Sequence, residues 1–333
     1  MTLSILHLVA LPFPSPHPLQ RTLRTTARAL AAEGHRVAIA CFHRGAGPAP
    51  REVDVIRGPR TAGGSRAIEA ALLARTVVRL LARRPVDVIH AHGGTAVLLA
   101  ALTRGVGSTT PIVADLDPSQ SPLPRWLARR CAAAVAFSSS ERDALLGFGL
   151  RRVAVIPPGV DLLDLAGGRA DRARSRWQLG DGPWILSLGG GQPSDRPLEE
   201  VPGAGHLVLG GVGPSSERVR FVAGNDPEHL RDALALAALA VVPGATWRAF
   251  PLELLTCLGS GLAVVSEAES AGLPGVVRAT AGEHGAVVSS LLADPGRCLS
   301  LGRAGREAVA AGWSAGRTAD ALARLYRELL PEN

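Results

Sequence analysis

The chain has 333 residues, of which 47% are hydrophobic and 20% charged, and its formal net charge is +7. This length suffices for two domains with a hydrophobic core each, and the 38 glycines and 25 prolines follow no period, which excludes a collagen-like chain. All 36 basic residues are arginines, and no basic stripe alternates with aromatic residues, so the composition argues against nucleic-acid binding as the main role.

Cysteine usage and hydropathy bear on the cellular compartment. No two cysteines form a C-x-x-C pair, so we expect reduced thiols and no metal site: Cys41, Cys131, Cys257 and Cys298. No apolar run reaches the length of a membrane span, and the apolar start at residues 3–10 lacks the preceding basic segment of a signal peptide. We therefore expect a cytoplasmic protein. An arginine-rich helix predicted over residues 66–84 leaves open a peripheral position at the inner membrane face.

The beginning of the chain predicts a βαβ unit. An apolar strand, a proline-rich loop, a helix and a second strand follow one another over residues 3–10, 12–18, 19–33 and 37–41. This order opens a doubly wound parallel sheet, in which ligands bind beyond the carboxyl ends of the strands. His17 and Gln20 follow the first strand, so they are candidate polar contacts; the alternative is that both are simply solvated.

Two later strands of the first half also end in polar residues. Residues 86–90 predict a buried strand with His92 at its carboxyl end, and residues 111–114 predict another that runs into Asp115 and Asp117. His92 is a candidate for hydrogen bonding to a ligand in the cleft, and the acid pair could act as a general base or bind a hydroxyl group. The alternatives are a histidine that only caps a turn, with His90 buried in the strand, and a solvated pair of acids.

The second half contains two glycine- or proline-marked strand ends. A strand over residues 183–188 runs into Gly189, Gly190 and Gly191, whose backbone N–H groups suit a phosphate; the alternative is that these glycines only form a turn. A helix over residues 226–240 then leads into the stretch 241–266, which predicts strand, loop, helix and strand. Pro251 suits the first turn of that helix, whose N-terminus beyond a strand favours an anionic ligand.

The stretch 241–266 resembles the nucleotide-sugar-binding core of glycosyltransferase family 4. The similarity rests on Phe250-Pro251-Leu252, the leucine-rich helix after it, and a Gly-x-Gly turn followed by Val264-Val265. Residues 155–161, VIPPGVD, resemble the interdomain passage of that family. The resemblance implies an α/β fold of two Rossmann-like domains facing a cleft, the GT-B type. It implies an N-terminal acceptor-side domain over residues 1–165, a nucleotide-sugar domain over 166–312, and a C-terminal helix, 313–333, that packs back on the first domain.

The same resemblance implies a function and a set of site residues. A nucleotide-diphosphate sugar would donate its sugar to a hydroxyl of a lipid-linked or glycan acceptor, with retained configuration and without a metal or other cofactor. It places His92 beside the reacting sugar. The family more often has a threonine and a histidine in the stretch of Asp117, so the catalytic role that we predict for Asp117 rests on the acid pair itself. His17 and Gln20 are the candidates on the acceptor side. The donor would be bound by Gly189, Gly190, Arg196, Arg248, Phe250, Pro251, Leu252 and Thr256.

Several family features are replaced in this chain. Arg248 and Thr256 stand where the family has two glutamates, and Gly190 stands where it has an arginine. The first loop has no glycine pair, and two gaps in the second domain are too short for the helices that the family places there, so we expect a trimmed second domain. An active transferase with an altered donor site is therefore one hypothesis. The others are a non-catalytic relative that scaffolds or regulates a partner glycosyltransferase, and a nucleic-acid or membrane-surface protein that relies on charge alone.

Overall fold

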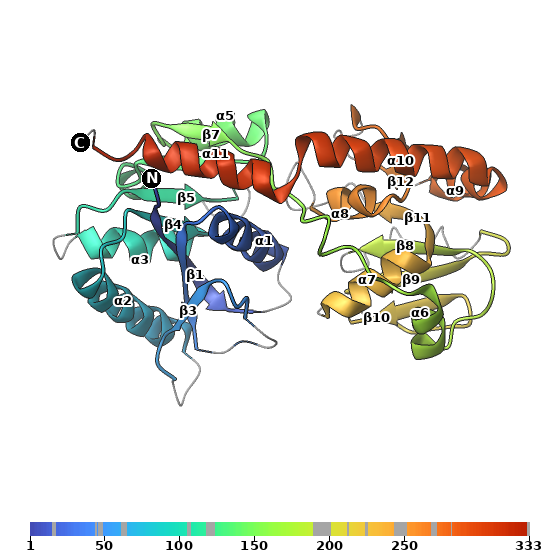
Figure 1. Ribbon diagram of the computed structural model, residues 1–333, viewed down its shortest axis with the longest axis horizontal. Helices are drawn as coiled ribbons and strands as arrows, with labels where there is room; N and C mark the ends of the chain where they lie inside the picture. The colour runs from blue at the N-terminus through green and yellow to red at the C-terminus, as the bar shows by residue number, and fades with distance from the viewer. Residues whose placement is uncertain are drawn as a thin grey trace. The chain divides into compact units, whose positions relative to one another are not determined.

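The computed structural model divides the chain into two compact units (Figure 1). It describes residues 1–14, 18–43, 45, 49–60, 65–104, 108–117, 124–188, 201–211, 213–223, 226–242, 252–267, 272–280 and 282–331. Unit 1 comprises Met1–Gly159 and Ala315–Asn333, and unit 2 comprises Val160–Ser314. The division lies at residues 159/160 and 314/315, where the sequence placed it at 165/166 and 312/313. Val160 already belongs to unit 2, because its N–H donates to the Trp313 carbonyl at 2.9 Å.

Unit 1 is built on a seven-stranded sheet in the order β3-β2-β1-β4-β5-β6-β7. Every neighbouring pair is parallel, and the order reverses between β1 and β4, as in a doubly wound sheet. The strands are β1 (Ser4–Pro12), β2 (Arg36–Phe42), β3 (Asp54–Arg57), β4 (Val88–His92), β5 (Ile112–Asp115), β6 (Ala133–Ala136) and β7 (Val153–Val155).

The two faces of this sheet differ in chemistry. The helices of unit 1 are α1 (Pro18–Ala32), α2 (Arg66–Arg83), α3 (Gly94–Arg104), α4 (Arg125–Ala128), α5 (Ser139–Gly147) and α11 (Ala315–Arg327). Leu6, Ile89 and Ile112 pack in one apolar core with Leu73 of α2 and with residues of α3. The alternate residues of these strands point to the opposite face, where α11 contacts the sheet through Tyr326.

Unit 2 repeats the architecture with a six-stranded parallel sheet in the order β10-β9-β8-β11-β12-β13. Its strands are β8 (Trp184–Leu188), β9 (Gly205–Leu209), β10 (Val219–Val222), β11 (Ala237–Val242), β12 (Val264–Ser266) and β13 (Val276–Arg278). Its helices are α6 (Ala170–Trp177), α7 (Pro227–Leu236), α8 (Leu252–Ser260), α9 (His284–Ala293) and α10 (Pro295–Gly312). The two units confirm the predicted α/β class with two Rossmann-like domains.

Two details of unit 2 bear on the sequence-based predictions. Neighbouring parallel strands are usually joined by a helix, but the described residues between β9 and β10 (210, 211 and 213–218) contain none, as expected for a trimmed domain. Residues 189–200, in the other gap, lie outside the described residues. The helix predicted over residues 226–240 ends at Leu236, since Ala237 begins β11 and pairs with Trp184 of β8.

Within the described residues, none of the helices is both long and apolar enough to cross a lipid bilayer.

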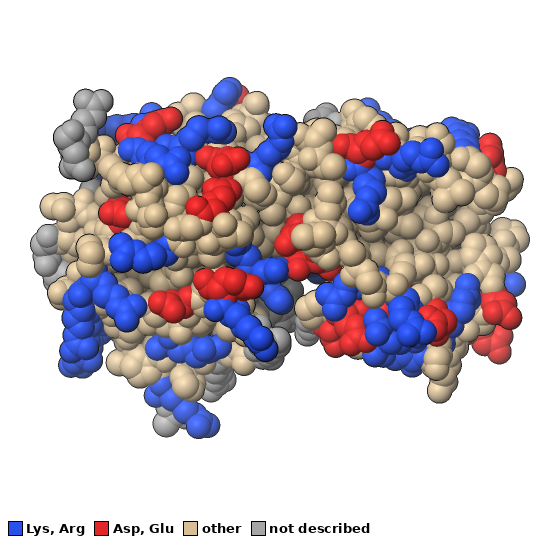
Figure 2. All heavy atoms as spheres, in the orientation of Figure 1, with Lys and Arg blue, Asp and Glu red and all other residues tan. Residues whose placement is uncertain are grey.

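A buried carboxylate ties α6 to α7 in unit 2. Asp232 is fully buried and accepts hydrogen bonds from the Arg169 N–H at 2.9 Å and from Arg172 Nε and Nη2 at 2.7 Å each. Arg176 Nη1 lies 3.4 Å from the same carboxylate. Figure 2 shows acidic and basic side chains gathered over these two helices. The guanidinium donors and the backbone N–H outweigh the effect of burial and lower the pKa of Asp232.

Replacing Asp232 with alanine should therefore destabilise unit 2. The free energy of unfolding should fall by about 2–3 kcal/mol. This is less than the loss for an ion pair in which both side chains are buried, because Arg172 and Arg176 keep about a third of their side chains exposed. Urea denaturation followed by circular dichroism measures it. Asp171→Ala, which removes an exposed partner of Arg169, is the control and should leave the transition unchanged. Equal transitions for both variants would contradict this account.

Candidate functional site

Four buried polar residues share one face of the unit 1 sheet. His7 of β1 lies opposite His90 of β4, and His92 lies opposite Asp115 of β5 in the parallel register. Because alternate residues of a strand point to the same side, all four side chains are on the face away from the α2–α3 core. Their exposed fractions are 0% for His7, 3% for His90, 6% for His92 and 4% for Asp115. We call this set, with Tyr326, the histidine cluster.

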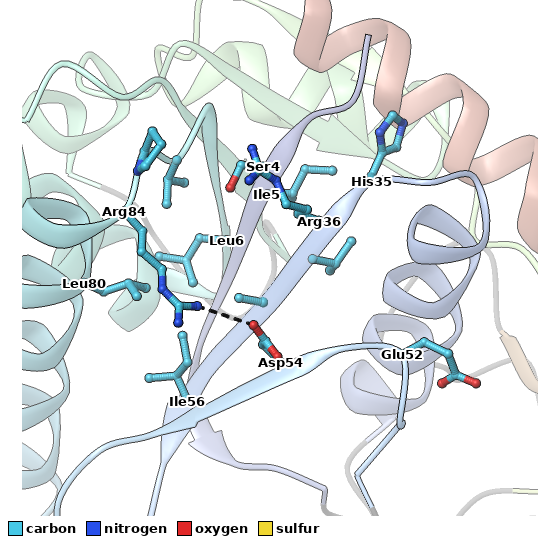
Figure 3. Close-up of a pocket in the computed structure, with 14 residues that line it drawn as sticks. Ser4, Ile5, Leu6, His35, Arg36, Glu52, Asp54, Ile56, Leu80 and Arg84 are labelled. Atoms are coloured by element: carbon cyan, nitrogen blue, oxygen red, sulfur yellow. Dashed lines mark ion pairs between the residues drawn. The ribbon is translucent and has the colours of Figure 1, made fainter.

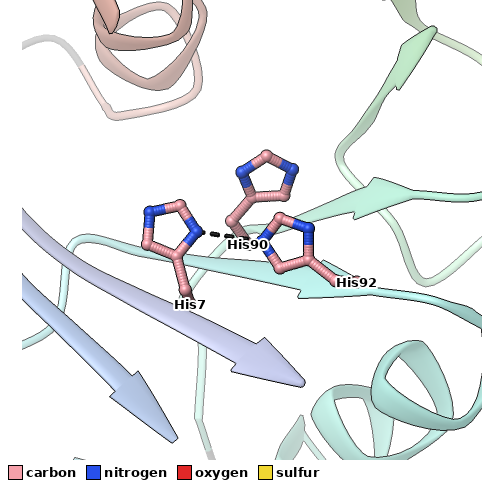
Figure 4. A group of neighbouring side chains, drawn as sticks. All are labelled: His7, His90 and His92. Carbon is pink, nitrogen blue, oxygen red and sulfur yellow. Dashed lines mark hydrogen bonds between the residues drawn. The ribbon is translucent and has the colours of Figure 1, made fainter. Parts of the chain in front are cut away.

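Hydrogen bonds connect the residues of the cluster, and Figure 4 shows the one between His7 and His92. His92 Nδ1 lies 2.9 Å from Asp115 Oδ2, and His92 Nε2 lies 3.0 Å from His7 Nδ1. An ionised carboxylate only accepts, so His92 Nδ1 carries the proton and Nε2 accepts from the Nδ1–H of His7. This assignment leaves His7 Nε2 as a bare acceptor. It has no hydrogen-bond partner among the residues that the structure describes.

A second bond connects the cluster to the end of the chain. His90 Nδ1 lies 2.6 Å from the hydroxyl of Tyr326, which α11 carries over the sheet and which is fully buried. The ring centroids of His90 and His92 are 4.4 Å apart, and those of His7 and His90 are 5.3 Å apart. The cluster thereby links β1, β4, β5 and α11.

Burial sets the charges of this cluster. Desolvation, helped by the nearby His92 and His90, holds the pKa of His7 well below its usual value, although Asp115 acts in the opposite direction. Desolvation and the charge of Asp115 raise the pKa of Tyr326 well above its usual value. His7 is therefore neutral and Tyr326 protonated at neutral pH.

The sequence-predicted residues of unit 1 fall in different environments. His92 is at the carboxyl end of β4, but both of its ring nitrogens already have protein partners. Asp117, two residues beyond β5, is partly buried. Gln20 is 2% exposed and its amide donates to the Pro12 carbonyl at the end of β1, so this side chain is not solvated. His17 lies outside the described residues.

Two of the predicted donor-binding residues of unit 2 are described. Leu252 begins α8 and is buried, and Thr256 is 2% exposed with its hydroxyl donating to the Leu252 carbonyl at 2.8 Å. The Thr256 hydroxyl thus satisfies its hydrogen bond within the helix. Six further predicted residues lie outside the described residues: Gly189, Gly190, Arg196, Arg248, Phe250 and Pro251.

A buried polar pair stands next to the predicted glycine loop of unit 2. The Ser187 hydroxyl near the end of β8 lies 2.9 Å from His206 Nε2 of β9, and both residues are almost fully buried. Burial lowers the pKa of His206 to about 4. Since a histidine with this pKa is neutral at physiological pH, the pair is an uncharged hydrogen bond.

A cavity of about 500 Å³ lies at the opposite edge of the unit 1 sheet (Figure 3). Its lining includes Ser4, Arg36 and Asp54, the first residues of β1, β2 and β3, and Arg84, which pairs with Asp54 at 3.6 Å. Because this is the amino edge of the strands, the cavity is separate from the carboxyl-edge site that the sequence predicts.

The chain matches a family model and curated sequences. Residues 19–163 match the model of Glycosyltransferase Family 4. The D-inositol 3-phosphate glycosyltransferase of Nocardia farcinica is 30% identical over 292 residues, which are 74% of this chain and 62% of that protein. The phosphatidyl-myo-inositol mannosyltransferase of Propionibacterium freudenreichii is 28% identical over 54% of this chain and 52% of that protein. In sequence the chain is therefore similar to glycosyltransferase family 4. It spans about half to three fifths of the length of these two relatives.

Several solved structures share the fold of this chain. Sucrose-phosphate synthase from Thermosynechococcus elongatus superposes with a TM-score of 0.78 at 17% identity, over 98% of this chain and 99% of that one. The Anabaena protein HepE in complex with UDP superposes with a TM-score of 0.70 at 16% identity, over 98% and 100% of the two chains. The fold is therefore of the GT-B type.

Acid should weaken this protein through His206. The pKa of His206 in the folded state is about 4, below the ordinary 6.5. The stability that its neutral side chain contributes is therefore complete above pH 6.5. As the pH falls toward 4 this stability is lost, up to about 3 kcal/mol in the free energy of unfolding. Unfolding free energies measured between pH 7 and pH 4 should fall less steeply in His206→Gln than in the wild type. The exposed His43 provides the matched control, His43→Gln, which should keep the wild-type slope. If the free energy of unfolding depended on pH equally steeply in His206→Gln and in the wild type, this assignment would be refuted.

Proposed function

We propose that this chain transfers a sugar from a nucleotide-diphosphate sugar to an acceptor hydroxyl, with retained configuration. The family match over residues 19–163 carries the proposal. The names of both curated relatives support it, since one is a glycosyltransferase and the other a mannosyltransferase. The two parallel-sheet units provide the architecture that such a reaction uses, with the donor on unit 2 and the acceptor on unit 1.

The donor side of the proposal rests on charge. The family places carboxylates where this chain has Arg248 and Thr256, and the Thr256 hydroxyl is bonded within α8. We therefore propose that Arg248 stabilises the negative charge that develops on the leaving diphosphate, a task that cations perform in transition states of this kind. The N-terminus of α8 would add its backbone N–H groups. The transfer would proceed without a metal cofactor.

The acceptor side of the proposal follows from the relatives and from the net charge. The relatives are named for inositol 3-phosphate and for phosphatidyl-myo-inositol, so we propose a polyol acceptor that carries a phosphate, either free or lipid-linked. A net charge of +7 favours an anionic acceptor. Asp117 would accept a hydrogen bond from the reacting hydroxyl, since both nitrogens of His92 are engaged in the cluster. A lipid-linked acceptor would bring the chain to a membrane surface.

A second candidate function is that of a non-catalytic partner of another glycosyltransferase. The internally bonded Thr256 hydroxyl favours it, and so does the connection between β9 and β10, whose described residues contain no helix. Both are departures in the unit that would hold the donor. Binding of a nucleotide distinguishes the two functions.

Isothermal titration with UDP, GDP, ADP and their sugar conjugates tests the donor site. We expect one nucleotide to bind at micromolar strength and Arg248→Glu to weaken it more than about tenfold, because a carboxylate would face the diphosphate. Arg303→Glu, an equal change of charge at an exposed position of α10, is the control and should bind as the wild type does. Absence of binding at millimolar concentrations for every nucleotide would overturn the transferase proposal and favour the partner role.

Once the donor is known, Asp117→Asn tests the acceptor side. We expect the kcat/KM for the acceptor to fall by about 10²-fold or more through loss of the general base, while the Kd for the nucleotide stays unchanged. Asp54→Asn, at the amino edge of the same sheet, is the matched control with wild-type rates expected. Wild-type transfer by Asp117→Asn would remove this residue from the proposal.

A further inference from the structure

The histidine cluster has the arrangement of a metal site. His7, His90 and His92 each offer one ring nitrogen, and the three atoms all lie within 4.8 Å of one another. All three histidines are on neighbouring strands of a rigid sheet and are buried, so their positions are set by the fold rather than by a loop (Figure 4). We propose that this cluster binds one zinc ion.

The surroundings of two of the histidines support this proposal. Histidines that bind metals commonly donate their other ring N–H to a carboxylate or another acceptor, which fixes the tautomer and the ring orientation. Here His92 is bonded through Nδ1 to Asp115, at 2.9 Å, and His90 through Nδ1 to the Tyr326 hydroxyl, at 2.6 Å. The Nε2 atom of each ring is thus on the side away from its supporting partner.

The third histidine is close to the required position. His7 Nδ1 and His92 Nε2 are 3.0 Å apart. Bonds of about 2.0–2.1 Å at tetrahedral angles hold two ligand nitrogens about 3.3 Å apart, so the ion needs only a small separation of these two rings. The proton on His7 Nδ1 would move to its Nε2, which has no partner among the described residues. No net proton is released by this exchange.

The donor set favours zinc over magnesium or calcium. Three neutral imidazoles suit Zn²⁺ and other late first-row ions, whereas Mg²⁺ and Ca²⁺ take oxygen ligands. The buried Asp115 carboxylate, hydrogen-bonded to His92 and not itself a ligand, would offset part of the positive charge of the ion. Three protein ligands leave a fourth position for a water molecule. The ion would hold β1 to β4. This role does not depend on the proposed transferase function.

Cobalt titration of the full chain, after treatment with a chelator and dialysis, tests the site. We expect one Co²⁺ per chain with the visible absorption of a tetrahedral complex, and displacement of that ion by Zn²⁺. His7→Leu should weaken binding by more than about 100-fold, and Asp115→Asn by about 10- to 100-fold. The matched control is His35→Leu, a buried histidine of the same unit that bonds the Leu3 N–H, and it should bind Co²⁺ as the wild type does.

Two further measurements keep the test decisive if a variant fails to fold. Tyr326→Phe removes only a hydroxyl, and we expect it to fold and to bind Co²⁺ about tenfold more weakly. Zinc should also raise the melting temperature of the wild type, since a ligand of the folded state stabilises it. A folded wild type that binds no Co²⁺ at millimolar concentration, or equal binding by wild type and folded His7→Leu, would overturn the proposal. The cluster would then be held by its hydrogen bonds alone.

Discussion

The parallel register of β1, β4 and β5 is the constraint on which unit 1 depends. It places His7, His90, His92 and Asp115 on one buried face, while the alternate leucines and isoleucines face α2 and α3. A one-residue slip of any of these strands would exchange the two sets. Polar groups can be buried there only because they bond to one another, and the Asp115 carboxylate gives the bonds their direction.

The same constraint connects the two ends of unit 1. The chain leaves this unit at Gly159, forms all of unit 2, and returns at Ala315 to add α11. Tyr326 then bonds His90, and the Thr318 hydroxyl donates to the Pro157 carbonyl at 3.0 Å. The C-terminal helix is therefore an integral part of unit 1. Unit 2 uses its buried charge differently, since Asp232 ties two helices together.

The fold could be predicted because each strand is a short run of apolar residues, and in each helix the apolar residues recur at helical spacing. The helix predicted over residues 226–240 ends at Leu236. Alanine and leucine occur in both helices and strands, so the sequence alone did not show that residues 237–240 form a strand. Their pairing with β8 places them in the sheet. The cluster could not be found in this way. His7 and His92 are 85 residues apart in the sequence, and the strand register brings them together. Tyr326 and His90 are 236 residues apart, and the packing of α11 on the sheet brings them together. One feature of the sequence could have pointed to His7, because this polar residue interrupts the apolar run of the first predicted strand, residues 3–10.

Sugar transfer itself tests the central claim most directly. The purified chain would be incubated with each common nucleotide sugar, with and without inositol phosphate or phosphatidylinositol vesicles, while release of the nucleoside diphosphate is followed. Our account predicts release that depends on an acceptor, and a product whose anomeric configuration by NMR equals that of the donor. Absence of acceptor-dependent release from a donor that the chain binds, or a product of inverted configuration, would contradict it.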